Sequence, residues 1–194
     1  MRMTAIEKHF VNDPGHTLRV ADRALMLLAR VDYQPGWRYL DVGCGVGAAA
    51  FEVAGRCSLD VTGVDVDPKQ IGSARARAAN PQPRFETMDA TRLEFQDAEF
   101  EIVASSMATH HIPRWEQAFV EMVRVLRVGG YLVYTDFMFP SWLAAFGRRF
   151  IPFVGIPSKE RVDSLAAQSG LSRIHEAHAG LQFDFIWRKS SWAG

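Results

Sequence analysis

The chain has no excess of charge of either sign. Its 194 residues include 22 lysines and arginines and 22 aspartates and glutamates, so the formal net charge is zero. Proteins that bind nucleic acid usually carry a basic excess that displaces counterions from phosphates, and a polybasic membrane anchor needs such an excess too. We therefore expect no nucleic-acid partner and no electrostatic anchor.

Cysteine and long apolar segments are also scarce. Cys44 and Cys57 have no metal-ligand spacing and make no disulfide framework, so we predict no metal site and a reducing, cytoplasmic location. No apolar run reaches the roughly 18 residues of a transmembrane helix, and residues 1–8 lack the apolar part of a secretory signal. The remaining composition, 48% hydrophobic and 23% charged, is that of one ordinary globular domain.

Strand-like and helix-like segments alternate through the middle of the chain. The strands expected are 39–42, 61–65, 84–87, 100–105 and 131–135, with helices 48–54, 68–80 and 115–126 among them. Asp67 is the expected N-cap of the second helix. We expect Gly129–Gly130 to end the third, since glycine commonly follows a helix C-terminus. This alternation predicts a mostly parallel sheet with helices on both faces.

The two ends of the chain depart from the alternation. Residues 4–31 are expected to be helical but broken, with apolar residues at helical spacing from Leu18 onward. Near the other end we expect a helix over 159–168, followed by strands over 172–178 and 182–188. These strands are close enough in sequence to pair as an antiparallel hairpin.

A glycine-rich turn separates the first strand from the first helix of the alternating region. Gly43, Gly45 and Gly47 allow a tight bend and a close approach of a ligand to the backbone, and the helix N-terminus beyond them offers free N–H groups. Asp65 follows Gly43 by 22 residues, at the end of the second strand, where a carboxylate can accept both hydroxyls of a ribose. The pattern predicts a nucleotide site. A tight turn without a ligand is the alternative.

The same turn satisfies the fingerprint of dinucleotide-binding proteins, so an NAD(P)-dependent oxidoreductase is an alternative function. Two features favour another ligand. Asp41 stands just before the glycines and would repel a pyrophosphate, but not a ligand with ammonium and sulfonium groups. The expected hairpin also takes the place of a second βαβαβ half.

Five segments resemble, in order, the motifs of class I S-adenosylmethionine-dependent methyltransferases. The first motif reads Leu40-Asp41-Val42-Gly43-Cys44-Gly45-Val46-Gly47, and the others are residues 63–68, 88–95, 100–111 and 124–132. The resemblance covers about residues 37–136. Val46 and Glu101 depart from it, since the family more often has a small polar residue and an aspartate there. The resemblance implies a single Rossmann-like α/β domain over residues 1–194, with a seven-stranded sheet that ends in the antiparallel hairpin.

The resemblance also implies a role for each candidate site residue. The methionine end of S-adenosylmethionine would be held by Asp41 and the turn residues Gly43, Cys44, Gly45 and Gly47. Asp65 would bind the ribose, Val66 would pack on the adenine, and Asp89 and the N–H of Ala90 would meet the adenine edge. Ser105 or Ser106 would lie near the amino group or the methyl group. Plainer interpretations stay open, namely a turn cap for Asp89, core for Val66 and ordinary strand-end residues for the serines.

The implied reaction is in-line displacement at the methyl carbon, in which positioning contributes most. His110 and His111 follow the fourth strand, at the edge where ligands bind in such sheets, and are the candidate general bases. Alternatively they only shape a loop. Asp136, at the end of the fifth strand, is a further lining residue of uncertain role. Residues 105–108 lack the carboxylates of metal-assisted methyltransferases.

An aromatic-rich stretch, residues 137–157, follows the fifth strand, where the family commonly inserts substrate-recognition elements. We expect a wall of the acceptor site there, while a helix packed on the core or at a dimer interface is an equal alternative and membrane contact a less favoured one. With residues 1–36 as a helical cover and 37–136 as the cofactor-binding core, the predicted function is methyl transfer to a small apolar or aromatic acceptor. A non-catalytic nucleotide-binding module and either a monomer or a homodimer remain open.

Overall fold

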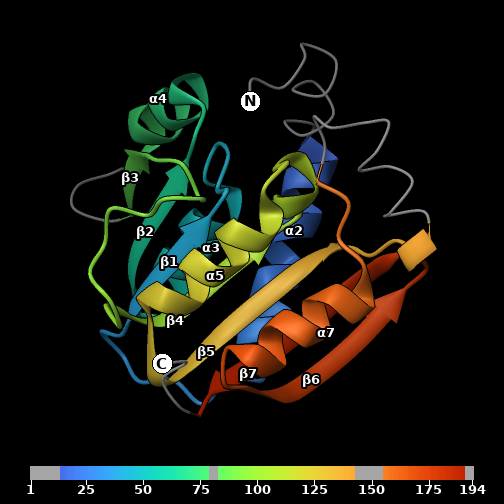
Figure 1. The fold of residues 1–194 in the computed structure, drawn as a ribbon. Helices are drawn as coiled ribbons and strands as arrows, with labels where there is room; N and C mark the ends of the chain where they lie inside the picture. Colours follow the sequence, from blue (N-terminus) through green and yellow to red (C-terminus); the bar gives the residue numbers. More distant parts are fainter. Residues whose placement is uncertain (1–13, 79–82, 143–154, 191–194) are drawn as a thin grey trace.

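A computed structural model of the chain describes residues 14–78, 83–142 and 155–190. Within these ranges a seven-stranded sheet has the order β3-β2-β1-β4-β5-β7-β6 (Figure 1). The strands are β1 (Arg38–Val42), β2 (Asp60–Asp65), β3 (Arg84–Thr87), β4 (Phe100–Ser106), β5 (Leu126–Phe137), β6 (Leu171–Ala179) and β7 (Gln182–Lys189). β1 to β5 are parallel, and β7 pairs antiparallel with both β5 and β6. The predicted fold class, a mostly parallel sheet with an antiparallel C-terminal hairpin, is confirmed.

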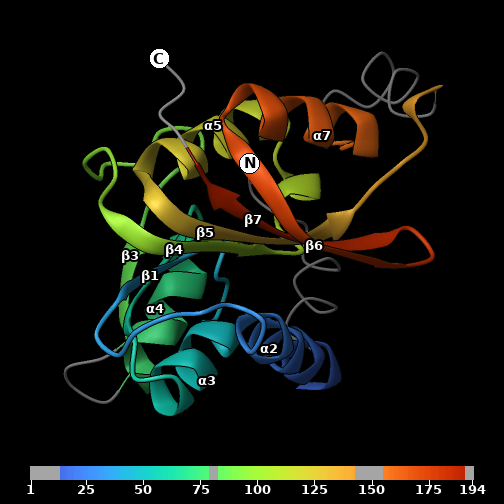
Figure 2. The ribbon, with the colours of Figure 1, turned by 90° about the horizontal axis from the view of Figure 1, so that it is seen from below.

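Helices cover both faces of this sheet. They are α2 (Pro14–Leu28), α3 (Ala48–Arg56), α4 (Pro68–Arg77), α5 (Trp115–Val125) and α7 (Lys159–Gln168), with a 3₁₀ turn η1 (Thr109–His111) after β4. Figure 2 shows α2, α3 and α4 on one side of the sheet and α5 and α7 on the other. Strands that are buried on both faces read as continuous apolar runs, and this is why the central strands were predictable.

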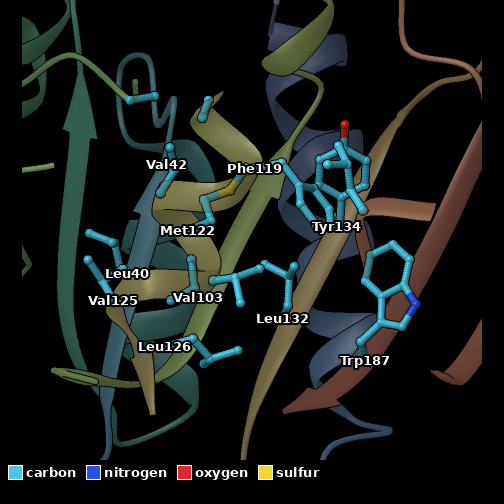
Figure 3. Close-up of a cluster of buried hydrophobic side chains, with 14 of the residues drawn as sticks. Leu40, Val42, Val103, Phe119, Met122, Val125, Leu126, Leu132, Tyr134 and Trp187 are labelled. Carbon is cyan, nitrogen blue, oxygen red and sulfur yellow. The ribbon is translucent and has the colours of Figure 1, made fainter. Parts of the chain in front are cut away.

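The core consists of two apolar layers, one on each face of the sheet. Successive residues of a central strand place their side chains in one layer and then in the other. In β4 the side chain of Ile102 joins the cluster beneath α2, α3 and α4, whereas Val103 joins the cluster beneath α5 and α7. Leu132 and Val133 of β5 divide in the same way. Figure 3 shows the second cluster, in which Phe119 and Met122 of α5 pack on the sheet. The sheet is thereby fixed between two packed layers, and its strand ends are rigid points for a site.

The start of α4 follows the prediction. Pro68 is its first residue, and the Asp67 side chain accepts a hydrogen bond from the N–H of Lys69 at 2.9 Å. This N-cap satisfies one of the free N–H groups of the first turn. The helix is described as far as Arg77, and the end predicted near residue 80 lies outside the described residues.

The prediction for Gly129–Gly130 is wrong. α5 ends at Val125 and β5 begins at the next residue, so both glycines lie inside the strand, where its pairing with β4 shifts register. The carbonyls at the helix end are met by the buried Lys189, whose Nζ donates to Val123 and Leu126 at 2.8 Å each. The Lys189 side chain from β7 therefore satisfies carbonyls at the helix end, which was the role expected of the glycine cap.

α2 forms the described part of the predicted N-terminal cover. Its buried side chains are Ala21, Ala24, Leu27 and Leu28, whereas Leu18 is 61% exposed although it fits the helical spacing. Residues 1–13 of the cover and 143–154 of the aromatic stretch lie outside the described ranges. Among the helices that are described, none is long and apolar enough to cross a membrane.

Candidate active site

The glycine turn joins β1 to α3 at the carboxyl edge of the sheet. Gly43, Gly45 and Gly47 all have positive φ, at +78°, +56° and +81°, which a residue with a side chain adopts only with strain. The N–H groups of Gly43 and Cys44 both donate to the carbonyl of Val64, at 2.8 and 3.0 Å. The turn is thus fastened to the end of β2 and bends as the sequence predicts.

Two of these glycines are also required by close contacts. A β-carbon at Gly43 would lie 2.3 Å from that of Ala108, and one at Gly47 would lie 2.5 Å from the Phe85 ring. Both distances are well inside van der Waals contact. The turn therefore packs directly against the segment that follows β4, which carries the candidate histidines.

A cavity opens beside the turn, between α2 and the end of β4. It is lined by the turn, the first residues of α3, Asp41, two residues of α2, the last residue of β4 and the residue that follows it: Thr17, Val20, Asp41, Gly43, Cys44, Gly45, Val46, Ala48, Ala49, Ser106 and Met107. α3 starts here without a side-chain cap, so its N-terminal N–H groups are available for a ligand.

Asp41 brings a negative charge to this cavity. Its side chain is 3% exposed, and burial, reinforced by the nearby Asp65 carboxylate, raises its pKa to about 7. Within the described part of the chain no cation pairs with it. Because an unpaired buried carboxylate is unfavourable, this position suits a cationic ligand group.

Asp65 turns toward the glycine turn. Its Oδ2 accepts a hydrogen bond from the N–H of Gly45 at 3.0 Å, and its Oδ1 accepts one from the N–H of Asp67 at 2.9 Å. The carboxylate is therefore fixed at the end of β2, next to the turn. A carboxylate at this position could accept the hydroxyls of a ribose.

The residues expected to contact the adenine, Val66, Asp89 and Ala90, differ in how exposed they are. Val66 is 48% exposed just after β2, and Ala90 is buried. Asp89 is exposed, and its Oδ1 accepts hydrogen bonds from the N–H and the hydroxyl of Thr91, each at 2.8 Å. This is the turn-cap arrangement that the sequence left open, and it leaves Oδ2 for a ligand. The adenine contacts stay predictions.

Cys44 and the two serines differ in what their side chains can reach. Cys44 lines the cavity, but burial and the Asp41 charge raise the pKa of its thiol well above the ordinary value, which keeps the thiol neutral. The Ser105 hydroxyl is buried and donates to the carbonyl of Val42 at 3.0 Å, tying β4 to β1. Ser106 lines the cavity. Of the two serines, Ser106 is the one that faces the site.

His110 forms a close pair with Asp136 from the end of β5. The His110 Nδ1 lies 2.5 Å from the Asp136 Oδ1, and the Asp136 side chain is completely buried. The N–H of Phe137 donates to the same oxygen at 2.7 Å, while the N–H groups of Thr109 and His110 donate to Oδ2 at 2.7 and 3.2 Å. A carboxylate that receives so many donors is an acceptor toward His110. In the arrangement that fits these contacts, His110 donates its Nδ1 proton to Asp136, and Nε2 is the ring nitrogen that could meet a ligand.

His111 lies beside His110 in the same 3₁₀ turn. The two ring centroids are 4.0 Å apart, and the His111 N–H donates to the carbonyl of Ala108 at 3.0 Å. Both histidines therefore lie at the edge of the sheet that carries the glycine turn, and His110 is the one that the structure pairs with the buried Asp136 carboxylate.

Sequence reasoning missed the partnership of Asp136 and the unusual backbone of Met107. A signal for the first existed, because the carboxyl ends of neighbouring parallel strands meet, so an aspartate after β5 lies near a histidine after β4. Met107 has a φ of +56°, a strained conformation for a bulky residue. We see no feature of the sequence that indicates it.

Comparisons with known proteins agree with this geometry. Residues 40–134 match a family described as the methyltransferase domain. The chain is 38% identical over 127 residues to 27-O-demethylrifamycin SV methyltransferase from Amycolatopsis mediterranei, covering 63% of this chain and 45% of that protein. It is 30% identical over 186 residues to 24-methylenesterol C-methyltransferase 2 from rice, Oryza sativa, covering 89% and 49%. The chain thus spans about half the length of these curated relatives.

The fold is shared with solved structures as well. A geranyl diphosphate methyltransferase, solved in complex with S-adenosylmethionine, superposes with a TM-score of 0.74 at 16% identity and covers 92% of each chain. The glycine turn, the carboxylates Asp41 and Asp65, the sheet order and these similarities lead to one conclusion: the chain belongs to the class I S-adenosylmethionine-dependent methyltransferases.

Proposed function

We propose that the protein binds S-adenosylmethionine at the glycine turn and transfers its methyl group to a hydroxyl group of a small, apolar or aromatic acceptor. The observation that carries the acceptor assignment is the 2.5 Å contact between His110 Nδ1 and Asp136 Oδ1. It gives the site a base beside the cofactor cavity, and a base serves an acceptor that must lose a proton.

Asp41 and Asp65 are the residues that would hold the cofactor. The Asp41 carboxylate is buried, lines the cavity and has no cationic partner among the described residues, so the ammonium of the methionine end would neutralise it. Asp65 already supports the turn through the N–H of Gly45, and its carboxylate would accept the ribose hydroxyls. A dinucleotide suits this site less well, because its pyrophosphate would approach the Asp41 charge.

When bound, the cofactor supplies an electrophilic methyl group on a sulfonium, and the sulfur departs as a neutral thioether. The protein then has two tasks, to align the acceptor oxygen with the methyl carbon and to take the proton of the hydroxyl. Alignment is worth about 7–11 kcal/mol when it is good. His110 Nε2 takes the proton as the new oxygen–carbon bond forms, and Asp136 stabilises the resulting imidazolium through Nδ1.

The surroundings of His110 support an apolar acceptor. Its ring lies 5.3 Å from that of Phe137 in an edge-to-face arrangement, and the aromatic stretch begins at this point of the chain. The two relatives named above act, by name, on a rifamycin oxygen and on a sterol carbon. The histidine–aspartate pair favours the first kind of acceptor for this chain, since an alcohol or phenol needs a base.

The test is methyl transfer from isotope-labelled S-adenosylmethionine to a panel of phenols, alicyclic alcohols, thiols and compounds with a nucleophilic carbon atom. Once one acceptor is found, we expect His110→Ala to lower kcat by about 10²- to 10⁴-fold and Asp136→Asn to lower it strongly too. The affinity for S-adenosylhomocysteine should stay within about twofold in both. His111→Gln is the matched control and should lose far less. Full activity in His110→Ala would refute the base, and transfer only to carbon or sulfur acceptors would refute the acceptor class.

A further inference from the structure

A chain of buried hydroxyl groups lies behind the His110–Asp136 pair. The Thr109 Oγ1 is 2.5 Å from the Asp136 Oδ2 and also 2.5 Å from the hydroxyl of Tyr134. All three residues have an exposed fraction of 0%. The chain thus runs from Tyr134 in the core, through Thr109 and Asp136, to the imidazole of His110.

The direction of these hydrogen bonds follows from the groups involved. Asp136 accepts from three backbone N–H groups, so it is an acceptor for Thr109 as well, and the single hydroxyl proton of Thr109 must point at it. Thr109 Oγ1 then accepts from Tyr134. Burial and the nearby Asp136 charge raise the pKa of Tyr134 well above its ordinary value, which keeps the phenol protonated and able to donate.

The far end of the chain is anchored in the rigid core. The Tyr134 ring packs on Phe119 with centroids 5.8 Å apart and on Trp187 with centroids 6.2 Å apart. Figure 3 shows these three rings together, with the Tyr134 hydroxyl pointing out of the apolar cluster. The phenol is held by two neighbouring rings, so its oxygen is a fixed point from which the polar chain starts.

We propose that Thr109, with Tyr134 behind it, is a positioning residue that orients the Asp136 carboxylate and so keeps the His110 proton on Nδ1 and Nε2 free for the acceptor. The inference rests on the proposed function of His110 for its catalytic meaning. Its physical content is the state of the imidazole, which exists in the resting protein without any acceptor.

The hydroxyl of Thr109 has a specific effect on Asp136. Oδ2 receives three donors, and the Thr109 hydroxyl is the one side-chain donor among them. Without the Thr109 hydroxyl, the Asp136 carboxylate rotates more easily about its Cβ–Cγ bond. The contacts of Oδ1 with Phe137 and His110 then have to hold its orientation. A neutral imidazole that loses a well-placed acceptor at Nδ1 can place its proton on Nε2 instead, which blocks the base.

Thr109→Val removes the hydroxyl with little change in shape, and Thr109→Ser restores it. The matched control is Thr135→Val. Thr135 of β5 is buried like Thr109, and its hydroxyl donates to another buried carboxylate, that of Asp184, at 2.9 Å. Nitrogen-15 NMR of histidine-labelled protein, free of acceptor, reads the tautomer of His110. Steady-state kinetics on an accepted hydroxyl compound then separate kcat from KM.

We expect Thr109→Val to shift His110 away from the Nδ1–H tautomer and to lower kcat by about 10- to 100-fold, with cofactor affinity unchanged. Thr109→Ser should restore both. Tyr134→Phe, which keeps the ring in the core, should show a smaller shift in the same direction and covers the case in which Thr109→Val fails to fold. Thr135→Val should leave the His110 signals unchanged.

The inference is overturned if Thr109→Val and Tyr134→Phe both keep the wild-type His110 tautomer, or if their losses in kcat match that of Thr135→Val. Its failure differs from failure of the proposed function. An active His110→Ala variant would refute the base and still leave the tautomer shift in Thr109→Val to be seen. An inactive His110→Ala with an unshifted tautomer in Thr109→Val would refute only the positioning role.

Discussion

Asp41, which we propose binds the cofactor, carries a charge whose burial weakens the fold. Its carboxylate is 3% exposed, next to the Asp65 carboxylate and without a cation among the described residues. Burial of a charge in this way is unfavourable unless a partner neutralises it. The buried charge therefore destabilises the free protein, and the ammonium of the proposed cofactor would remove this destabilisation.

Asp41→Asn should accordingly stabilise the free protein. The folded state raises the pKa of Asp41 from its ordinary 3.8 to about 7, so the folded chain binds more protons than the unfolded chain between these pH values. The free energy of unfolding therefore falls as the pH rises from about 4 to 7, because Asp41 becomes charged while buried. We expect urea denaturation at pH 8 to show Asp41→Asn more stable by up to about 4 kcal/mol, and the gain to vanish near pH 4. An equal gain at both pH values would contradict the pKa shift.

The same group predicts how cofactor affinity depends on pH. A protonated Asp41 must release its proton before it can pair with an ammonium, and its pKa in the free protein is about 7. Affinity for S-adenosylhomocysteine should therefore be constant above pH 7 and fall by about tenfold per pH unit below it. Asp41→Asn should bind weakly and without this dependence. Wild-type affinity that does not change between pH 5.5 and 8 would exclude Asp41 as the partner of the ammonium.

Among the elements, α5 shows a helix end that depends on a distant strand. Lys189 of β7 is 1% exposed and donates to the carbonyls of Val123 and Leu126. Burial lowers the pKa of this lysine. Its position is explained by the carbonyls it satisfies, since buried acceptors without a donor are costly.

Lys189→Met should lower the free energy of unfolding by roughly 1–3 kcal/mol, because it leaves two buried carbonyls without their donor. Lys159→Met is the matched control. Lys159 is partly exposed, and its ion pairs with Asp163 and Glu176 are expected to contribute less than about 1 kcal/mol. Urea midpoints of the two variants and the wild type measure the difference. Similar losses in both would show that the buried lysine has no special role.

The elements also show what a sequence can predict. β3 and α7 have the predicted bounds, Arg84–Thr87 and Lys159–Gln168, because turn and cap residues next to each element mark its ends. The end of α5 was predicted wrongly, because the group that terminates it is a lysine 63 residues beyond Leu126 in the sequence. Local glycine chemistry carries no information about that contact.

For the whole molecule, the parts of the site that depend on local contacts could be predicted from the sequence, and the parts that depend on distant contacts could not. The glycine turn, Asp41 and Asp65 were predictable because their spacing follows from one strand–turn–helix–strand unit. The partnership of His110 with Asp136 required the neighbouring position of β4 and β5. The link through Thr109 to Tyr134 required side-chain geometry. Most of the stretch predicted to form the acceptor wall, residues 137–157, lies outside the described residues, which lack 143–154.

The central claim is that the edge of the sheet at β1 and β2 is a site for S-adenosylmethionine. Calorimetric titration with S-adenosylhomocysteine at pH 8, on the wild type, Asp65→Ala and Asp67→Ala, tests it most directly. We predict binding at one site by the wild type and by Asp67→Ala, which removes the N-cap of α4, and an affinity about 10- to 100-fold lower in Asp65→Ala. Absence of binding to the wild type, tighter binding of NAD, or equal affinity in all three proteins would contradict the account.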